Sequence, residues 1–571
     1  MSKPMKRFNI HLITAMLACM AAFPGHAATV NVNVRSNKGN LTQELRQRCA
    51  HAAYGDTVVL NFAKGNYTID GTIVLNTHVV IKGAGRGSTT ITLDKGSDRN
   101  GYKAFLDDTF FKVAGTLKRP VTLSISDITI KLKEHTGVWW AGERCFAVKV
   151  YHASRVDIRH VDSYMHNAIC TNFDLQVCSN VTVTDCVISN YNNTTDGGNL
   201  WLRGEMHNIN VKRNKFYKYG KDEAVGIFDR LVDNSTNSYV RGKASRTDIF
   251  VEDNEFHYKY DGKDKNMADN CYNHTVLSVM TDHSKSKDCC TTRNLHITRN
   301  KFVMTDMTAR CMYISFDPAD VHSGIFIEDN TIVNEAVGYD KRCYRQDIEV
   351  NDLSACGDTI RINGNRVSNK KLVLDPSGAQ GYSFLLVQGG NVCMDGNKIV
   401  NEATVIPGSG KSTGVQLVWC GEQGGSVTMR NNVCKGIKCI AAIGAGNGTD
   451  KFTLNASNNY FAGDTRVYCH KVKRLDINFT GNTLVSGNMN FFLQEFAPTG
   501  TVVFNNNNVT VNGGNGQFMT HWSANSTRDY RFERLEVKNN VLHGVNSEQD
   551  LFINVTNVGK RTARANTITR Q

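Results

Sequence analysis

The segment VEDNEF at residues 251–256 decides the fold, because close variants of it recur along most of the chain. Each variant has an apolar residue, two mostly polar residues, an asparagine, any residue and a second apolar residue. The other clear copies are VKRNKF (211–216), ITRNKF (297–302), IEDNTI (327–332), INGNRV (362–367), MDGNKI (394–399) and VKNNVL (537–542). Repetition with a period of about 20 to 50 residues indicates a solenoid, a propeller or an array.

The asparagine of each unit marks a tight turn between two short strands. Asparagine tolerates the left-handed backbone conformation that such a turn needs, and stacked asparagines can hydrogen-bond to one another as a ladder. Consecutive asparagines are 23 to 46 residues apart. We therefore expect a parallel β-helix with these structural residues in one corner: Asn214, Asn254, Asn300, Asn330, Asn365, Asn397, Asn432, Asn459, Asn482, Asn507, Asn540 and Asn566.

A third strand precedes each asparagine unit, so each coil of the solenoid should have three strands and three turns. These strands are AVKVYHA (147–153), NLWLRGE (199–205), AVGIFDR (224–230), VLSVMTD (276–282), CMYISFDP (311–318), FLLVQGG (384–390), GVQLVWCG (414–421) and FFLQEF (491–496). The connection that leads into this strand is long and variable. Because loops on a rigid scaffold carry most functional sites, we expect the site beside these strands.

The first 27 residues are typical of an export signal. Lys3, Lys6 and Arg7 precede the apolar segment 10–23, and small residues around Ala27 suit a signal peptidase. Cleavage there lowers the formal net charge from +13 to +10. We expect an exported protein, periplasmic, cell-surface or secreted, with no transmembrane segment, no nucleic-acid partner and a monomeric state. The positive charge suits an acidic polysaccharide, although dispersed surface lysine explains it equally well.

The cysteines do not follow a zinc-binding pattern. Many lie inside strand-like segments, such as Cys186, Cys311 and Cys420, and these are expected to be buried free thiols. Others lie in polar segments and could form disulfides in an exported protein. For these we consider two pairings, Cys289 or Cys290 with Cys271, and Cys343 with Cys356.

The N-terminal part of the mature chain predicts a cap. Residues 41–53 have apolar residues at helical spacing, and a helix there would cover the open end of the core. The segment that follows resembles the opening of proteins in the pectate-lyase superfamily, through Gly65, Tyr67, Gly83, Gly85, Gly87 and Thr89. The resemblance implies a right-handed parallel β-helix, with cap and first coils at 28–118 and the remaining coils at 119–571. That fold hosts many activities, so function must come from the site.

The best candidate catalytic residues are Asp196, Asp222 and Glu223. Asp196 stands before one strand, and Asp222 and Glu223 stand before the equivalent strand one coil later. Adjacent coils are about 4.8 Å apart, so the three carboxylates should cluster on one rim. Crowded carboxylates raise one another's pKa, and an acid beside a base or nucleophile is what glycoside hydrolysis requires.

This region also resembles polygalacturonase-type hydrolases, through the segments NTTDG (193–197) and KDEA (221–224). That resemblance implies catalytic carboxylates at the same three positions. The sequence departs from the family pattern, because one residue is inserted before Asp196 and glutamate replaces the second aspartate. The later Gly-His-Gly and Arg-x-Lys segments of that family are also missing.

Residues near these carboxylates are candidate substrate contacts. If Leu200 and Leu202 match Val225 and Ile227 as inward residues, Trp201 points outward and Asp196 lies level with Lys221. An outward tryptophan could stack on a sugar ring. The other expected contacts, beside Trp201 and Lys221, are Arg203, Asp229, His274 and Arg310.

No cofactor is expected, although a second acidic set could bind calcium through its oxygen atoms: Asp282, Asp317 and Asp320. We therefore expect an exported enzyme that hydrolyses an acidic polysaccharide. Two alternatives stay open. One is a polysaccharide lyase, with Lys221, Arg203 or Arg310 assisting β-elimination, and the other is a surface β-helix that binds glycans without cleaving them.

Overall fold

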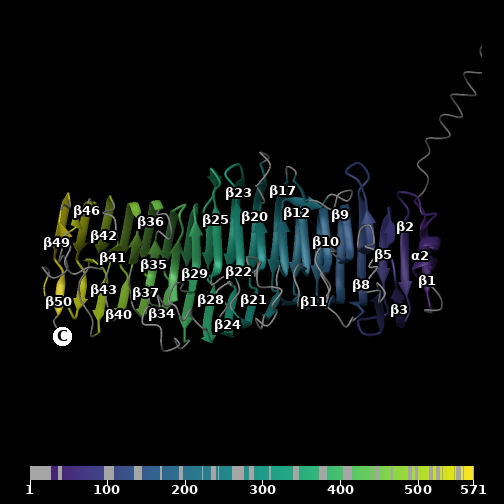
Figure 1. The fold of residues 1–571 in the computed structure, drawn as a ribbon, viewed down its shortest axis with the longest axis horizontal. Helices are drawn as coiled ribbons and strands as arrows, with labels where there is room; N and C mark the ends of the chain where they lie inside the picture. Colours follow the sequence, from purple (N-terminus) through teal and green to yellow (C-terminus); the bar gives the residue numbers. More distant parts are fainter. Residues whose placement is uncertain are drawn as a thin grey trace, which may run out of the picture.

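The computed structural model describes most of the chain after residue 26. The described residues are 27–35, 41–94, 109–133, 145–166, 170–191, 197–220, 223–232, 239–241, 244–259, 275–281, 289–307, 310–338, 346–371, 382–402, 415–437, 439–443, 449–463, 467–486, 491–494, 499–512, 519–521, 528–529, 532–545, 547, 555–556 and 559–569. They form a right-handed parallel β-helix whose strands belong to one 46-stranded hydrogen-bonded sheet (Figure 1). This confirms the predicted fold.

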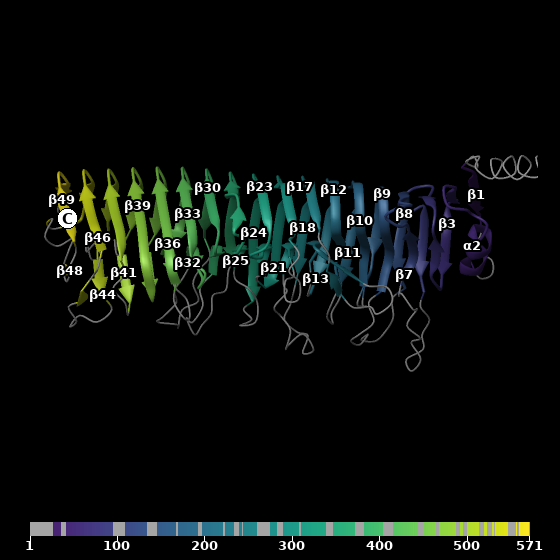
Figure 2. The same ribbon diagram turned by 90° about the horizontal axis from the view of Figure 1, so that it is seen from above.

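Most coils contribute one strand to each of three faces, and the strands of successive coils run side by side along the axis (Figure 2). Face 1 holds the strands that precede the asparagine units. They are β4 (Ile73–Leu75), β7 (Thr109–Ala114), the first parts of β9 (Cys145–Tyr164), β10 (Cys170–Thr184) and β12 (Leu200–Lys212), then β14 (Val225–Phe228), β19 (Thr275–Met280), β22 (Arg310–Phe316), β25 (Gln346–Asp352), β29 (Tyr382–Gln388), β32 (Val415–Cys420), β35 (Cys439–Ile443), β38 (Val467–His470), β41 (Phe491–Gln494) and β44 (Met519–His521).

Face 2 holds the strands that lead into the asparagine turn. They are β1 (Thr29–Val34), β2 (Thr57–Phe62), β5 (His78–Lys82), the first part of β8 (Val121–Leu132), later parts of β9, β10 and β12, then β17 (Ser245–Glu252), β20 (Thr291–Thr298), β23 (Val321–Glu328), β26 (Cys356–Gly357), β27 (Ile360–Asn363), β30 (Asn391–Asp395), β33 (Gly425–Arg430), β36 (Thr449–Ser457), β39 (Val472–Thr480), β42 (Gly500–Asn505), β46 (Phe532–Lys538) and β49 (Lys560–Arg564).

Face 3 holds the strands that follow that turn. They are β3 (Gly65–Ile69), β6 (Thr89–Leu93), the ends of β8 and β9, then β11 (Val187–Tyr191), β13 (Lys215–Tyr219), β18 (Glu255–Lys259), β21 (Lys301–Met307), β24 (Thr331–Gly338), β28 (Arg366–Lys371), β31 (Lys398–Asn401), β34 (Val433–Ile437), β37 (Tyr460–Gly463), β40 (Thr483–Ser486), β43 (Asn508–Val511), β47 (Val541–His543) and β50 (Thr567–Thr569). Two small pairs lie outside this sheet, β15 (Arg230–Val232) with β16 (Tyr239–Arg241) and β45 (Arg528–Asp529) with β48 (Val555–Thr556).

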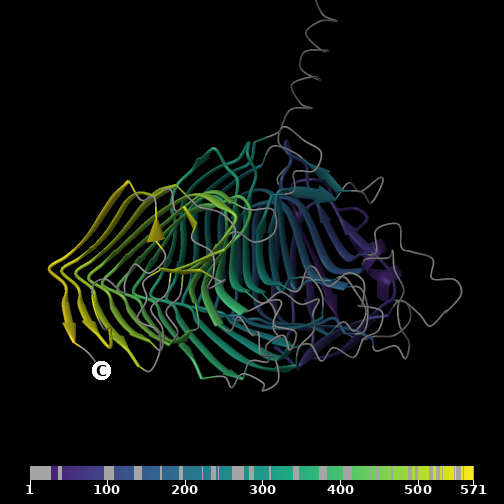
Figure 3. The ribbon, with the colours of Figure 1, turned by 60° about the vertical axis from the view of Figure 1, so that its left-hand side comes forward.

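The predicted asparagines line the corner between faces 2 and 3, and the corners of successive coils stack in line (Figure 3). In each step the backbone N–H and the side-chain amide of one asparagine donate to the Oδ1 of the asparagine in the next coil. The ladder runs without a break from Asn214 to Asn566. The side-chain amide also donates to a backbone carbonyl of the coil before, as Asn330 does to Ile297 at 2.8 Å.

One detail of the turn differs from the prediction. The left-handed residue is the one before each ladder asparagine, for example Asp253, Arg299, Asp329 and Asn431, all with φ between 54° and 57°. The ladder asparagines themselves are not among the residues with positive φ. Asparagine is therefore selected at its own position for its amide, and the unit tolerates many residues at the preceding, strained position.

The N-terminal end of the stack is covered by α2 (Leu41–Cys49), which confirms the predicted cap. Leu41, Leu45 and Cys49 are buried against the first coils. Side chains inside the solenoid stack coil on coil, as in Phe216, Phe256 and Phe302, whose rings lie 4.9 and 4.8 Å apart. In the described part of the chain, no helix is both long and apolar enough to cross a membrane.

The prediction of buried free thiols is confirmed for three of the described cysteines in strand-like segments, whereas Cys393 is only half-buried. Cys186, Cys311 and Cys420 are buried free thiols. Cys289, Cys290 and Cys356 are also free thiols, so they are not in the disulfides considered above. Their suggested partners, Cys271 and Cys343, lie outside the described residues.

Candidate active site

The register of face 1 determines which side chains point outward. Leu200 pairs with Val225 and Leu202 pairs with Ile227, as the sequence predicted. All four residues lie in the hydrophobic core. Trp201, between the two leucines, belongs to a separate cluster on the outer side with Phe146, Phe228 and Met280.

The middle outward position of face 1 carries charged and aromatic residues in successive strands. Along the axis these residues are Lys112, Lys149, Asp174, Trp201, Gly226, Ser278, Tyr313, Glu349, Leu386 and Trp419. Lys149, Asp174, Ser278 and Glu349 are all buried. Burying a charge on the outer side of a sheet costs free energy unless the charge is paired. The partners of each charged residue therefore determine whether that residue could contact a ligand.

Asp174 and Arg203 form a buried ion pair on this surface. The Nε of Arg203 donates to Oδ1 of Asp174 at 2.9 Å, and the amide of Gln176 donates to Oδ2 at 2.8 Å. The guanidinium lies over the rings of Trp201 and Phe228, at 4.4 and 5.1 Å from their centroids. Since both charged side chains are essentially inaccessible, we interpret this pair as support for the surface and not as a group that touches substrate.

Trp201 faces outward as expected but is only 3% exposed. Phe146 and Phe228 pack edge-to-face against it on both sides, and Gly198 and Gly226 leave the space that its ring fills. A Cβ on Gly198 would lie 2.2 Å from the indole nitrogen. The expected sugar-stacking role is therefore replaced by packing, because the faces of the ring are covered by protein.

Glu223 lies two residues before β14 and faces outward. Its Oε1 accepts a hydrogen bond at 3.0 Å from the hydroxyl of Ser278, on the neighbouring strand β19. The backbone of Gly198 lies against that of Glu223, since a Cβ on Gly198 would be 2.9 Å from the carbonyl oxygen of Glu223. The chain segments that follow Asp196 and Asp222 therefore run side by side here.

Four of the predicted site residues lie outside the described residues: Asp196, Lys221, Asp222 and His274. Of the three predicted catalytic carboxylates, the structure therefore locates Glu223 alone.

Arg310 forms a second buried ion pair, on β22, which lies three strands further along face 1 than the strand of Arg203. Its guanidinium donates to Glu349, its Nε donates to the hydroxyl of Thr275 at 2.9 Å, and it lies 3.9 Å from the ring centroid of Tyr313. Thr275 lies directly opposite Arg310 in the sheet. The positive charge predicted at Arg310 is present on this surface, but Glu349 neutralises it.

Asp229 does not line this outer surface, in contrast to the prediction. It is 1% exposed and its carboxylate accepts from the thiol of Cys290 at 3.5 Å, at the corner between faces 1 and 2. Burial lowers the pKa of the Arg246 guanidinium, and the nearby Cys290, Asp229 and Asp320 partly offset this effect. Asp229 therefore belongs to an interior polar cluster, because the pleat turns it inward after Phe228.

The acidic set considered for calcium does not form a site among the described residues. Asp320 accepts backbone N–H bonds from Cys290 and Asp317, both at 2.9 Å, so its two oxygens already stabilise the corner. Asp282 lies outside the described residues, and the described part of the chain contains no group of three or more potential metal ligands.

A buried carboxyl group lies inside the solenoid at the start of β25. Burial raises the pKa of Asp347 to about 7, although Tyr382, Asn334 and Cys311 all donate hydrogen bonds to it. Burial and the nearby Asp347 raise the pKa of the Tyr382 hydroxyl, which therefore stays protonated as the donor. This pair is inaccessible, so it bears on stability and not on substrate binding.

Sequence reasoning missed several residues of the outer surface, above all Lys149, Asp174, Ser278 and Glu349. A signal was present, because each stands alone between two inward apolar residues in a short strand: VKV (148–150), FDL (173–175), LSV (277–279) and IEV (348–350). Aligning these triplets across coils would have shown a row of polar residues.

The comparisons with known proteins concern the fold. No protein-family model and no curated protein sequence matches this chain. Among solved structures, it is similar to the catalytic unit of a GH87 α-1,3-glucanase from Streptomyces thermodiastaticus, with 16% identity, 79% of this chain and 70% of that one covered, and a TM-score of 0.42. It is also similar to tailspike protein 3 of bacteriophage CBA120 (11% identity, 88% and 59% covered, TM-score 0.38) and to a family 28 exopolygalacturonase from Yersinia enterocolitica (9%, 76% and 78%, 0.34).

Proposed function

We propose that the protein is an exported enzyme that hydrolyses glycosidic bonds in an acidic polysaccharide, with its active site on the outer side of face 1. Glu223, Asp196 and Asp222 would be the catalytic carboxylates. The observation that carries the proposal is the contact between the backbones of Gly198 and Glu223. Asp196 is two residues from Gly198 in the sequence, and Asp222 precedes Glu223 directly, which supports the proposal that the three carboxylates act together.

The proposed hydrolysis depends on the close spacing of these three carboxyl groups. Two residues of chain span at most about 7 Å, so Asp196 starts within reach of the spacings of roughly 5 to 10 Å used in glycoside hydrolysis. One carboxyl must be protonated to assist the leaving oxygen, and neighbouring carboxylates favour that by raising its pKa. The hydroxyl of Ser278 donates to Oε1 of Glu223 at 3.0 Å and would hold this carboxyl group in place for the proposed role of base or nucleophile.

The ion pairs of Arg310 and Arg203, two of the three cations considered for β-elimination, support hydrolysis. A lyase must neutralise the carboxyl group of a uronate, usually with a metal or a free cation. Arg310 is paired with Glu349 and Arg203 is paired with Asp174, so neither positive charge is directed at a substrate. Lys221 and His274 are then the proposed substrate contacts, together with the positive charge of the mature chain.

The test is a panel of acidic and neutral polysaccharides assayed in parallel for new reducing ends and for the absorbance of unsaturated products. Hydrolysis gives reducing ends without that absorbance. Glu223→Gln should abolish most of the activity, about 100-fold or more, and leave the thermal midpoint nearly unchanged. The matched control is Glu402→Gln, because Glu402 is exposed after β31 and should not affect activity.

Three results would contradict the proposal, and each would favour another function or another site. Unsaturated products would identify a lyase. Activity that survives Glu223→Gln, Asp196→Asn and Asp222→Asn would place the site elsewhere. Binding of an acidic glycan without any product would identify a glycan-binding β-helix.

A further inference from the structure

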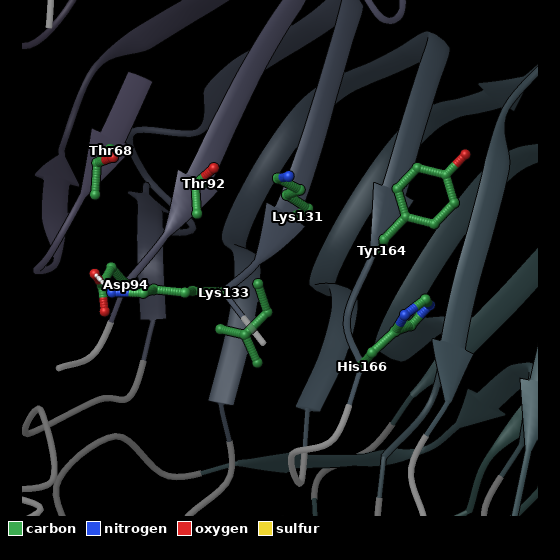
Figure 4. A pocket seen from close by; sticks show the side chains of 8 residues that line it. Thr68, Thr92, Asp94, Lys131, Lys133, Tyr164 and His166 are labelled. Atoms are coloured by element: carbon green, nitrogen blue, oxygen red, sulfur yellow. Dashed lines mark hydrogen bonds and ion pairs between the residues drawn. The ribbon is translucent and has the colours of Figure 1, made fainter. Parts of the chain in front are cut away.

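A surface pocket of about 580 Å³ lies on the outer side of face 3, near the N-terminal end of the stack (Figure 4). It is separate from the candidate active site, which lies on face 1. Two parallel rows of side chains line it. They are Thr68, Thr92, Lys131 and Tyr164 in one row, and Asp94, Lys133 and His166 in the other.

The register of face 3 creates these rows. Thr68 pairs with Thr92, Thr92 with Lys131, and Lys131 with Tyr164, on β3, β6, β8 and β9. The three steps between four strands make a strip roughly 14 Å long. A strip of that length can contact more than one ring of an extended ligand.

The charge of the pocket is positive. Lys133 pairs with Asp94 at 2.7 Å, with Lys133 half exposed. Lys131 is exposed, and none of the described carboxylates forms an ion pair with it. Figure 4 shows the Lys131 side chain between Thr92 and Tyr164, so one uncompensated positive charge lies in the middle of the strip.

The far end of the pocket is formed by two aromatic side chains that contact each other. The rings of Tyr164 and His166 meet edge-to-face at 5.9 Å, and Nε2 of His166 lies 3.0 Å from the hydroxyl of Ser189. Burial, followed by the charge of Asp162, raises the pKa of the Tyr164 hydroxyl, which therefore stays protonated and able to donate in neutral and mildly alkaline solution.

We infer that this pocket binds an anionic sugar unit of a glycan, one that carries a carboxylate or a sulfate. The lysine ammonium would meet the anionic group, Tyr164 would cover the apolar face of a sugar ring, and the two threonine hydroxyls would bond to sugar hydroxyls. The inference rests on the proposed function only in taking the ligand to be a glycan. The pocket would be a second binding site, separate from the proposed active site on face 1.

The experiment measures binding to the full mature chain by calorimetry, with three probes of similar length: an oligogalacturonate, a sulfated oligosaccharide and a neutral cello-oligosaccharide. We expect the anionic probes to bind more tightly than the neutral one. Changing Lys131→Ala together with Lys133→Ala should weaken anionic binding about tenfold, and Tyr164→Ala should weaken it several-fold. Lys82→Ala is the charge-matched control, because Lys82 is exposed on β5, which belongs to face 2, and it should change binding less than about twofold.

The outcomes separate this site from the active site. Glu223→Gln should leave the pocket's affinity unchanged. If the enzyme cleaves a glycan but the pocket variants bind like Lys82→Ala, the pocket proposal fails and the proposed function stands. If no glycan is cleaved but the lysine variants lose anionic binding, the pocket proposal stands alone. A preference for the uronate or for the sulfated probe identifies which anion the site accepts.

Discussion

Asn330 donates two hydrogen bonds to a single oxygen atom of Asn365, which is 35 residues later in the sequence. Its backbone N–H and its side-chain amide both reach Oδ1 of Asn365, each at 3.0 Å. The same arrangement repeats at each step of the ladder. One side chain per coil thus satisfies a buried backbone N–H of the preceding coil, as Asn330 does for Asn300, and ties three coils together.

Asn330→Ala should therefore destabilise the protein strongly. The change removes the bond to Ile297 and one bond to Asn365, and leaves the backbone N–H of Asn300 buried without its acceptor. We expect a loss on the order of 3 kcal/mol, seen as a lower thermal midpoint. Asn391→Ala is the control, because Asn391 is an exposed asparagine on β30, and an equal effect of the two changes would contradict the role of the ladder.

At the left-handed position before each ladder asparagine, two substitutions should have opposite effects on the free energy of unfolding. Gly396 has φ +64 and open space around its missing Cβ, so Gly396→Ala should destabilise by about 1 kcal/mol through backbone strain alone. Ala565 has φ +56 at the equivalent position, so Ala565→Gly should relieve strain and leave the protein equally stable or slightly more stable. Thermal melting of both variants checks the pair, and effects of the same sign would show that the turn is not strained.

Asp174→Ala should lower the stability of the protein without changing the catalytic rate of the folded molecules. It leaves the buried guanidinium of Arg203 without its carboxylate, which typically costs about 3 to 5 kcal/mol. We expect a large fall in the thermal midpoint, with the remaining folded protein retaining its turnover. Arg203→Met in the same chain should restore much of the stability, because it removes the unpaired charge. A loss of turnover in fully folded protein would instead make Asp174 part of the chemistry.

Asp347 should make the protein more stable in mild acid. Its pKa of about 7 in the folded chain lies above the ordinary value near 4, so the folded state holds a proton that the unfolded state releases between those values. This contribution to stability is present below about pH 4 and is lost as the pH rises to about 7.

The measurement is the difference in thermal midpoint between pH 5 and pH 8. Asp347→Asn should reduce that difference, because a neutral amide replaces the protonated acid. Asp358→Asn, at an exposed site, should leave it unchanged. Identical pH profiles for wild type and Asp347→Asn would show that the buried acid does not titrate in this range.

The fold was predictable because its signal is local and repeated. The asparagine unit occupies six consecutive residues, and the inward positions of β12 and β14 follow from alternation of apolar residues. The paired groups of the outer surface were harder to predict. Asp174 and Arg203 are 29 residues apart and meet only because their strands adopt one register across two coils. Trp201 was correctly placed on the outer side, but its burial depends on Phe146 and Phe228, which no local pattern connects to it.

The ladder also separates the length of a coil from the rise of the solenoid. Asn459 and Asn482 are 23 residues apart and Asn254 and Asn300 are 46 apart, yet each pair is joined by the same hydrogen bonds. Much of the extra length in the longer coil falls at residues 260–274, between β18 and β19, away from the asparagine corner. The length of that connection can therefore change while the asparagines of the neighbouring coils keep the same hydrogen bonds.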